Sequence, residues 1–322
     1  MNILVTGCAG FIGFHLSKKF LKKDFFITGV DNLNNYYDTA IKKERLKILK
    51  KYKNFNFIRG DLKKKSLYTK IKNLNNINYI YHFAGQAGVR YSIENPVEYI
   101  KDNIIGFINL LETFKFSKKL KAIFYASSSS IYGNEFNKSS NLSTVRPISV
   151  YAVSKISMEM LSQVYLNLYK IKSVGLRFFT VYGPWGRPDM AYFKFCKLNK
   201  EKKTIEVYNK GNHYRSFTYI DDVINNILLI KKKINKINLY KKNVFNVGNP
   251  KMISLKKLII ELEKNLNVKF KKKFKNKQMG DVLNTRSNNK FENKIFRFKF
   301  ETDFEKGVKK FTDWFSAYYE KK

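Results

Sequence analysis

The chain has 322 residues, 44% of them hydrophobic and 16% aromatic, which is enough for a packed core and excludes general disorder. Its 63 lysines and arginines against 25 acidic residues give a formal net charge of +38, and because most are lysines scattered along expected helices and loops, we interpret them mainly as solvated surface. Two cysteines exclude a disulfide framework, and the sequence has neither a signal-peptide pattern nor the roughly 20 apolar residues of a membrane helix, so we expect a cytoplasmic protein that binds no membrane.

Short apolar runs alternate with helical segments through the first 180 residues. The expected strands cover residues 2–6, 26–30, 55–58, 77–83, 122–127 and 173–180. The expected helices cover residues 11–22, a lysine-rich segment that ends at Lys50, and residues 96–116 and 151–169. Strands that alternate with crossover helices predict an α/β fold with a doubly wound parallel sheet.

After Gly183 the loops lengthen, and strands and helices become mixed. This change predicts a boundary near residue 180, between an N-terminal domain (1–180) and a smaller C-terminal α/β domain (181–322). Residues 245–247 form a short apolar run that could return to the first domain as a strand, so the division need not be clean.

The first strand runs into the first helix through a glycine-rich segment, Thr6-Gly7-Cys8-Ala9-Gly10-Phe11-Ile12-Gly13. Its three glycines permit a tight turn, close approach of the backbone to a pyrophosphate, and close packing of the helix on the strand. The helix that opens with Phe11 and Ile12 then presents free N–H groups to the phosphates. Because a strand precedes the segment and a helix follows it, the segment predicts a Rossmann-type dinucleotide site.

An acidic residue, Asp31, follows the second strand, and Asn32 beside it is a further expected cofactor contact. At this place a carboxylate can accept hydrogen bonds from the adenosine ribose hydroxyls and repel the 2′-phosphate of NADP, so the sequence favours NAD. The alternative is an aspartate that caps the loop beginning at Asn32.

Further cofactor contacts are expected after the next two strands. Asp61 and Leu62 follow the third strand, where an aspartate can receive the adenine amino group, and an ordinary turn aspartate is the alternative. Ala84 and Gln86 follow the fourth strand, where small residues let the backbone pass beside the cofactor.

Tyr151 and Lys155 lie four residues apart, on one face of an expected helix. A tyrosine pKa near ~10 is too high for a general base at neutral pH. A neighbouring ammonium together with a positive nicotinamide ring favours the phenolate, so we expect Lys155 and bound NAD to lower the pKa of Tyr151. Ser128 ends the fifth strand, on the edge where parallel sheets bind ligands. These three residues form the expected catalytic set.

The order of these motifs resembles that of the extended short-chain dehydrogenase/reductases, the NAD-dependent epimerase/dehydratase family. Within it the chain resembles UDP-glucuronate 4-epimerases over nearly its whole length. The stretches that carry the resemblance are 29–37 (GVDNLNNYY), 84–92 (AGQAGVRYS), 177–191 (RFFTVYGPWGRPDMA) and 217–222 (FTYIDD). The third stretch is long, odd in composition and highly specific.

The resemblance implies C4 epimerisation of a nucleotide sugar, best UDP-glucuronate to UDP-galacturonate, through a transient 4-keto sugar with bound NAD. Tyr151 is then the base and acid at the sugar O4, Ser128 hydrogen-bonds that oxygen, and Lys155 holds the nicotinamide ribose. The other implied substrate contacts are Arg90, Ser129, Thr180, Arg187, Arg215 and Asp281, and for each arginine a plain surface charge is the alternative. The helices at 96–116 and 151–169 are the implied interface of a homodimer.

Related activities stay open as alternatives: a hexose 4-epimerase, a 4,6-dehydratase or a uronate decarboxylase. Dehydratases carry an Asp-Glu pair where Ser129 and Ser130 stand, and decarboxylases carry a Glu at the place of Ser130. Hexose 4-epimerases usually carry Asn at the place of Thr180. The chain also departs from the family pattern, mostly on the nucleotide-binding side, at Gly85, Met279, 286–288 and Phe300.

The distant alternative is a basic nucleic-acid-binding protein on a cofactor fold. The sequence has no recognisable helix-turn-helix, zinc module or aromatic stacking motif. We therefore expect no nucleic-acid partner and no metal.

Overall fold

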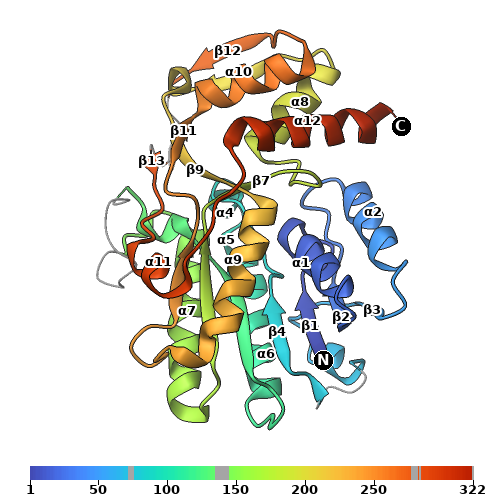
Figure 1. The fold of residues 1–322 in the computed structure, drawn as a ribbon, viewed down its shortest axis with the longest axis vertical. Helices are drawn as coiled ribbons and strands as arrows, with labels where there is room; N and C mark the ends of the chain where they lie inside the picture. Colours follow the sequence, from blue (N-terminus) through green and yellow to red (C-terminus); the bar gives the residue numbers. More distant parts are fainter. Residues whose placement is uncertain (72–75, 135–144, 277–281, 283, 321–322) are drawn as a thin grey trace.

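A seven-stranded sheet, parallel throughout, forms the centre of the larger part of the molecule (Figure 1). The computed structural model describes residues 1–71, 76–134, 145–276, 282 and 284–320. The predicted α/β class with a doubly wound parallel sheet is confirmed. In sheet order the strands are β10 (Val244–Val247), β6 (Ser173–Phe178), β5 (Ala122–Ser128), β4 (Tyr79–His82), β1 (Asn2–Thr6), β2 (Phe26–Asp31) and β3 (Phe55–Arg59).

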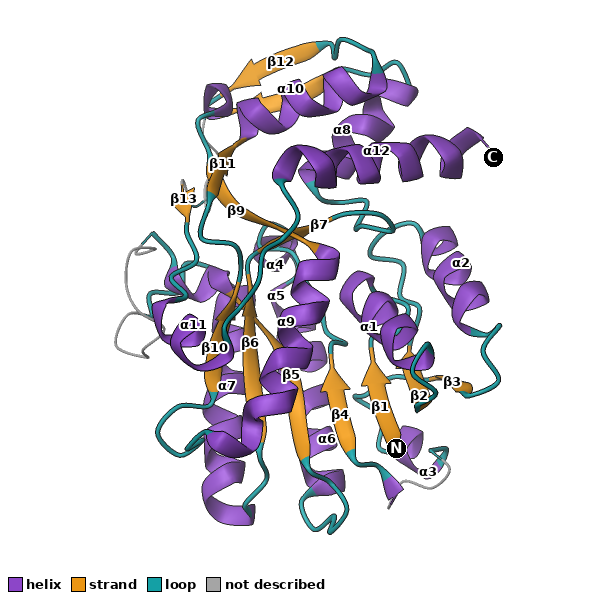
Figure 2. Ribbon diagram, in the orientation of Figure 1, coloured by secondary structure: helices purple, strands orange, loops and turns teal. Residues whose placement is uncertain are grey.

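Helices cover both faces of this sheet (Figure 2). Along β1, Ile3 and Val5 pack into one apolar cluster, and Leu4 between them packs into another. The first cluster includes residues of α1 (Phe11–Leu21), α2 (Thr39–Leu49) and α9 (Ile220–Lys233). The second includes residues of α3 (Ser66–Thr69), α6 (Gly106–Phe114) and α7 (Val150–Tyr169). Burial on both faces explains why these strands are apolar runs rather than alternating ones.

A smaller α/β part lies beyond the carboxyl ends of the large sheet (Figure 1). Its strand β9 (Tyr214–Tyr219) pairs with β7 (Thr180–Tyr182), β11 (Met252–Ser254) and β13 (Asn284–Thr285). A separate parallel pair joins β8 (Ile205–Tyr208) to β12 (Lys272–Lys275). The helices of the C-terminal half, besides α9, are α8 (Ala191–Lys200), α10 (Leu255–Leu266), α11 (Lys290–Phe296) and α12 (Phe304–Glu320).

Two expected elements differ in the structure. The strand expected at 173–180 is divided at Phe179, so β6 stays in the large sheet while β7 pairs with β9 in the smaller one. The long helix expected at 96–116 consists of α5 (Pro96–Tyr99), a π-helical segment at Ile100–Ile105, and α6. The short helix α4 (Tyr91–Glu94) precedes it.

Segments on both sides of residue 180 build the large sheet and its cover. β10 pairs with β6, and α9 packs against α1. The chain therefore crosses between the two parts more than once. Within the described residues, the helices are too short or too polar to cross a bilayer.

Candidate active site

A cavity of about 950 Å³ opens at the carboxyl ends of the large sheet and extends beneath the smaller part. Every predicted site residue within the described chain contributes to its lining, whereas Asp281 lies outside the described residues. Those residues are Gly7, Gly10, Phe11, Ile12, Gly13, Asp31, Asn32, Asp61, Leu62, Ala84, Gln86, Arg90, Ser128, Ser129, Tyr151, Lys155, Thr180, Arg187 and Arg215. The sequence motifs thus converge because parallel strands end on one edge of the sheet.

The glycine loop fits a dinucleotide pyrophosphate. Gly7 has φ +71°, and a Cβ there would lie 2.6 Å from the backbone N of Ala84. A Cβ on Gly13 would meet the carbonyl oxygen of Gly7. The α1 helix begins after Gly10 with no side-chain cap, so the N–H groups of its first turn are open to an anion in the cavity.

Asp31 holds two backbone segments at once. Its Oδ2 accepts a hydrogen bond from the Ala9 N–H at 3.1 Å, and its Oδ1 accepts one from the Leu33 N–H at 2.9 Å. Burial raises the pKa of this carboxyl, and the Leu33 N–H and the Lys42 ammonium oppose the rise. A carboxylate has about four acceptor sites, so capping the turn leaves capacity for ribose hydroxyls.

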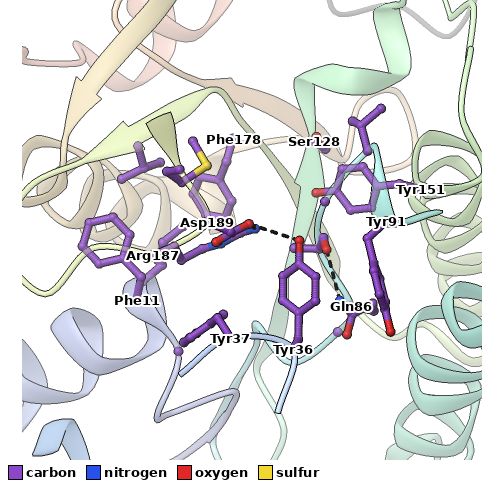
Figure 3. A pocket seen from close by; sticks show the side chains of 18 of the residues that line it. Phe11, Tyr36, Tyr37, Gln86, Tyr91, Ser128, Tyr151, Phe178, Arg187 and Asp189 are labelled. Atoms are coloured by element: carbon purple, nitrogen blue, oxygen red, sulfur yellow. Dashed lines mark hydrogen bonds and ion pairs between the residues drawn. The ribbon is translucent and has the colours of Figure 1, made fainter. Parts of the chain in front are cut away.

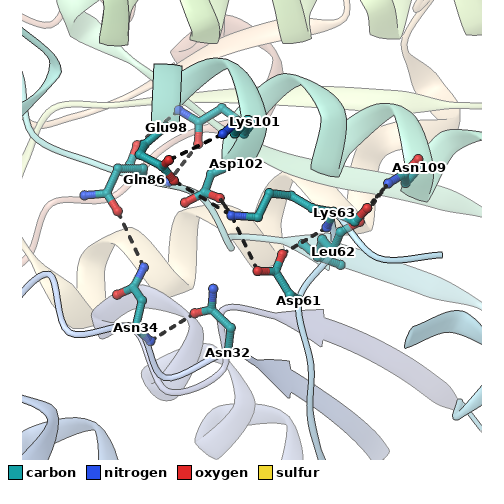
Figure 4. Close-up of polar contacts among 11 residues, drawn as sticks. Asn32, Asn34, Asp61, Leu62, Lys63, Gln86, Glu98, Lys101, Asp102 and Asn109 are labelled. Atoms are coloured by element: carbon teal, nitrogen blue, oxygen red, sulfur yellow. Dashed lines mark hydrogen bonds and ion pairs between the residues drawn. The ribbon is translucent and has the colours of Figure 1, made fainter. Parts of the chain in front are cut away.

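A lysine absent from the sequence-based expectations organises the neighbouring acidic residues (Figure 4). The Lys63 Nζ lies 2.6 Å from Asp102 Oδ1 and 3.5 Å from Asp61 Oδ2. Asp61 Oδ1 also accepts a hydrogen bond from the Lys63 N–H at 3.0 Å. Asp61 thus caps its own turn and also borders the cavity.

Asn103, also missed from the sequence, fixes the backbone at Gln86. Its Oδ1 accepts from the Gln86 N–H at 2.8 Å, and its Nδ2 donates to the Gln86 carbonyl at 3.1 Å and to Ser154 Oγ at 2.8 Å. Asn103 belongs to the π-helical segment, a type of distortion that is frequent at functional sites. The feature of the sequence that could have indicated this role was an asparagine within a largely apolar segment expected to be helical.

Two of the expected catalytic residues, Ser128 and Tyr151, face each other at the end of β5 (Figure 3), and Lys155 lines the same cavity. Helix α7 starts at a Ser149 cap, which places Tyr151 in its first turn and Lys155 one turn later. Ser128 Oγ accepts a hydrogen bond from the Ser130 N–H at 3.1 Å, and the Ser128 hydroxyl lies close enough to Tyr151 to affect its pKa. The Lys155 Nζ is 5.9 Å from the centroid of the Tyr151 ring.

Burial shifts the pKa of two residues of this set away from their ordinary values. Burial raises the pKa of the Tyr151 hydroxyl, and the Ser128 hydroxyl and the charge of Arg187 only oppose that rise. Burial also lowers the pKa of Lys155 to about 8, since only 4% of this residue is exposed. In the protein alone, burial therefore dominates the pKa of both side chains.

Two of the three arginines, Arg187 and Arg215, reach the cavity from segments that follow β7, and Arg90 reaches it from the loop before α4. Arg187 forms an ion pair with Asp189, and Asp189 accepts a hydrogen bond from the Tyr36 hydroxyl at 3.1 Å, which links the two sides of the cleft (Figure 3). Arg215 on β9 donates to the Tyr214 carbonyl at 3.0 Å. The Arg90 guanidinium stacks 5.1 Å from the centroid of the Tyr208 ring.

Thr180 directly follows Phe179, where the chain passes from the large sheet to the smaller one. It is the first residue of β7 and pairs in register with Phe217. Ser129 begins the short 3₁₀ turn after β5. Both residues are half-buried and border the cavity. The two protein hydroxyls that we expect to contact the substrate therefore line the same cavity as Tyr151.

Comparison with known proteins gives a consistent picture. The model of the NAD dependent epimerase/dehydratase family matches residues 3–248. Protein CapI of Staphylococcus aureus is 41% identical, with 100% of each chain covered, and UDP-glucuronate 4-epimerase 2 of Arabidopsis thaliana is 39% identical over 99% of this chain and 76% of its own. A crystal structure of UDP-glucuronic acid 4-epimerase from Bacillus cereus with UDP-glucuronic acid and NAD superimposes with a TM-score of 0.87 at 32% identity, covering 99% of this chain and 100% of that one.

Proposed function

This chain belongs to the NAD-dependent epimerase/dehydratase family, and we propose that it converts UDP-glucuronate to UDP-galacturonate by inversion at C4. One observation supports this proposal most directly. Ser128, Tyr151 and Lys155 lie beside the glycine loop in one cavity, and β5 ends in serine hydroxyls rather than carboxylates.

The protein's own residues move one proton and hold the sugar. Tyr151 takes the proton from the sugar O4 and returns it at the end of the cycle, with Ser128 hydrogen-bonded to the same oxygen. Lys155 holds the ribose next to the reactive ring. Bound NAD supplies the hydride acceptor for C4 and, while oxidised, a positive charge that favours the Tyr151 phenolate. The 4-keto sugar must turn over in the cavity before the hydride returns.

The residues after β5 separate epimerisation from its rivals. Oxidation at C4 makes a β-keto acid, which loses its carboxylate readily when the C5–C6 bond aligns with the carbonyl π system. Neutral hydroxyls on Ser129, Ser130 and Thr180 can hold the carboxylate away from that alignment without protonating C5. No acid stands at Ser130 to assist decarboxylation or water loss.

The surface of α5 to α7 favours a homodimer. Apolar side chains remain exposed there: Val97 57%, Ile100 39%, Ile105 42%, Val153 44%, Met160 57%, Val164 47% and Leu168 66%. We propose that the same helices of a second copy cover them, because monomers rarely expose patches of this kind. The two cysteines are free and buried, which agrees with a cytoplasmic protein.

The decisive test is a proton NMR time course with UDP-glucuronate and NAD, in which evolved carbon dioxide is trapped in parallel. We expect UDP-galacturonate with little carbon dioxide. Dominant UDP-pentose signals would instead establish a decarboxylase. Unchanged UDP-glucuronate beside rapid UDP-glucose turnover would establish a hexose epimerase. The Tyr151→Phe variant is the matched control for contaminating activity.

A further inference from the structure

The segment from Pro184 to Asp189 has a conformation that the site described above does not explain. Trp185 has φ +59°, a left-handed backbone that is unusual for a bulky side chain. Its indole packs on Phe14 at 5.7 Å and on Trp314 at 5.2 Å between ring centroids. Backbone strain of this kind persists only where the surroundings fix it, and it is frequent at ligand clamps.

Three consecutive carbonyls of this segment are held by side chains from the NAD-binding half. The Arg45 Nη2 donates to the carbonyls of Trp185 at 2.6 Å and Gly186 at 2.9 Å. The His15 Nε2 lies 3.0 Å from the carbonyl oxygen of Pro184. Burial lowers the pKa of His15 to about 3, so its imidazole is neutral and donates from Nε2. Two helices, α1 and α2, therefore fix the backbone that immediately precedes Arg187.

The other half of the Arg45 guanidinium contacts the glycine loop. Its Nη1 donates to the Ala9 carbonyl at 2.8 Å and to the Tyr37 hydroxyl at 3.0 Å. The N–H of the same Ala9 donates to Asp31. Arg45 is completely buried, and all four of these hydrogen bonds go to uncharged acceptors. The Asp31 carboxylate lies near enough to interact with this buried cation, and only a forked planar donor can join the four oxygens.

We propose that Arg45 is a positioning residue that couples the NAD site to the substrate arginine. When NAD occupies the glycine loop, it fixes the Ala9 peptide. Arg45 then restrains the backbone of Trp185 and Gly186. This restraint holds Arg187 in position for the diphosphate of the nucleotide sugar. The inference rests on the proposed function only in assigning Arg187 to the substrate. Because the coupling between two binding sites is reciprocal, a bound nucleotide sugar also increases the affinity of the protein for NAD.

Calorimetric titration with UDP tests the coupling without turnover. NAD-loaded wild type is expected to bind UDP at least ~5-fold more tightly than protein stripped of NAD, the lower end of ordinary coupling. Arg45→Met should reduce that ratio to less than ~2-fold. Arg45→Lys, which keeps the charge and loses the fork, should do the same and serves where the methionine variant does not fold. Arg177→Lys is the matched control, because Arg177 is equally buried and donates hydrogen bonds to Glu159 and Tyr132; it should keep the wild-type ratio.

A double-mutant comparison tests the route through Arg187. Arg45→Met should weaken UDP binding to NAD-loaded protein when Arg187 is present and have less than ~2-fold effect in an Arg187→Met background. Equal effects in both backgrounds, or a wild type whose UDP affinity ignores NAD, would overturn the coupling. A wild type that binds NAD but no UDP at all would instead contradict the proposed function.

Discussion

Replacing Arg177 by methionine should destabilise the protein more than any surface substitution of the same kind. Arg177 on β6 donates to Glu159 on α7 at 2.8 Å through Nε and 2.7 Å through Nη2, and the two side chains are 0% and 1% exposed. Glu159 Oε1 also accepts a hydrogen bond from Ser127 Oγ. Without the arginine, a buried carboxylate stays behind uncompensated, which costs about 3–5 kcal/mol of unfolding free energy.

Urea unfolding followed by tryptophan fluorescence measures this loss. Lys203→Met is the matched control, since Lys203 pairs with Glu201 at 2.8 Å but the two side chains are 65% and 37% exposed; it should leave the urea midpoint almost unchanged. Adding Glu159→Leu to Arg177→Met should restore at least half of the lost stability, because it removes the uncompensated buried carboxylate. If Arg177→Met cost no more than Lys203→Met, or if the double variant were less stable still, the reasoning from burial would be refuted.

Four further predictions concern the site and the assembly. Tyr151→Phe should lower kcat by at least ~10²-fold while calorimetric UDP affinity stays within ~3-fold, and more than half of the activity remaining would contradict the proton step. NAD should copurify or be required, with no net NADH absorbance during turnover; a strict requirement for NADP would contradict the role given to Asp31. Burial lowers the folded-state pKa of Lys155 to about 8, so the unfolded chain binds more protons than the folded one between that pH and about 10.5. Lys155→Met should therefore be more stable than NAD-free wild type by about 3 kcal/mol at pH 7, and urea titrations should show this difference vanish as the pH rises through the window. Met160→Glu with Val164→Glu should yield a monomer by light scattering, and an unchanged mass would exclude α7 from the dimer interface.

The sequence was sufficient for those parts of the site that depend on local pattern. The glycine loop needs its three glycines in a strand–turn–helix context, and Tyr151 and Lys155 need one helical turn between them. Each motif could be placed on an element, and parallel strands bring their carboxyl ends to one edge. The cavity that joins the glycine loop, Asp31 and Ser128 was therefore predictable in outline.

The residues that were missed have partners far away in the chain. Arg45 lies in a helix whose composition suggested a solvated surface, yet its acceptors at Trp185 and Gly186 are 140 and 141 positions away. Tyr36 meets Asp189 across 153 positions. The pKa of Tyr151 also depended on burial, which motif spacing does not reveal. Local propensity carries no information about such contacts, because tertiary packing decides them.

The position of β10 has a consequence for the order in which the protein is made. When the ribosome has completed β6, that strand has an unpaired edge, because its neighbour β10 is encoded about 65 residues later. Synthesis at ~5–20 residues per second leaves this edge open for roughly 3–13 s, in addition to the exit-tunnel delay. An exposed strand edge is a template for aggregation. The nascent chain should therefore depend most on chaperones in this interval, and a ribosome stalled between β6 and β10 should hold the most aggregation-prone form of the protein.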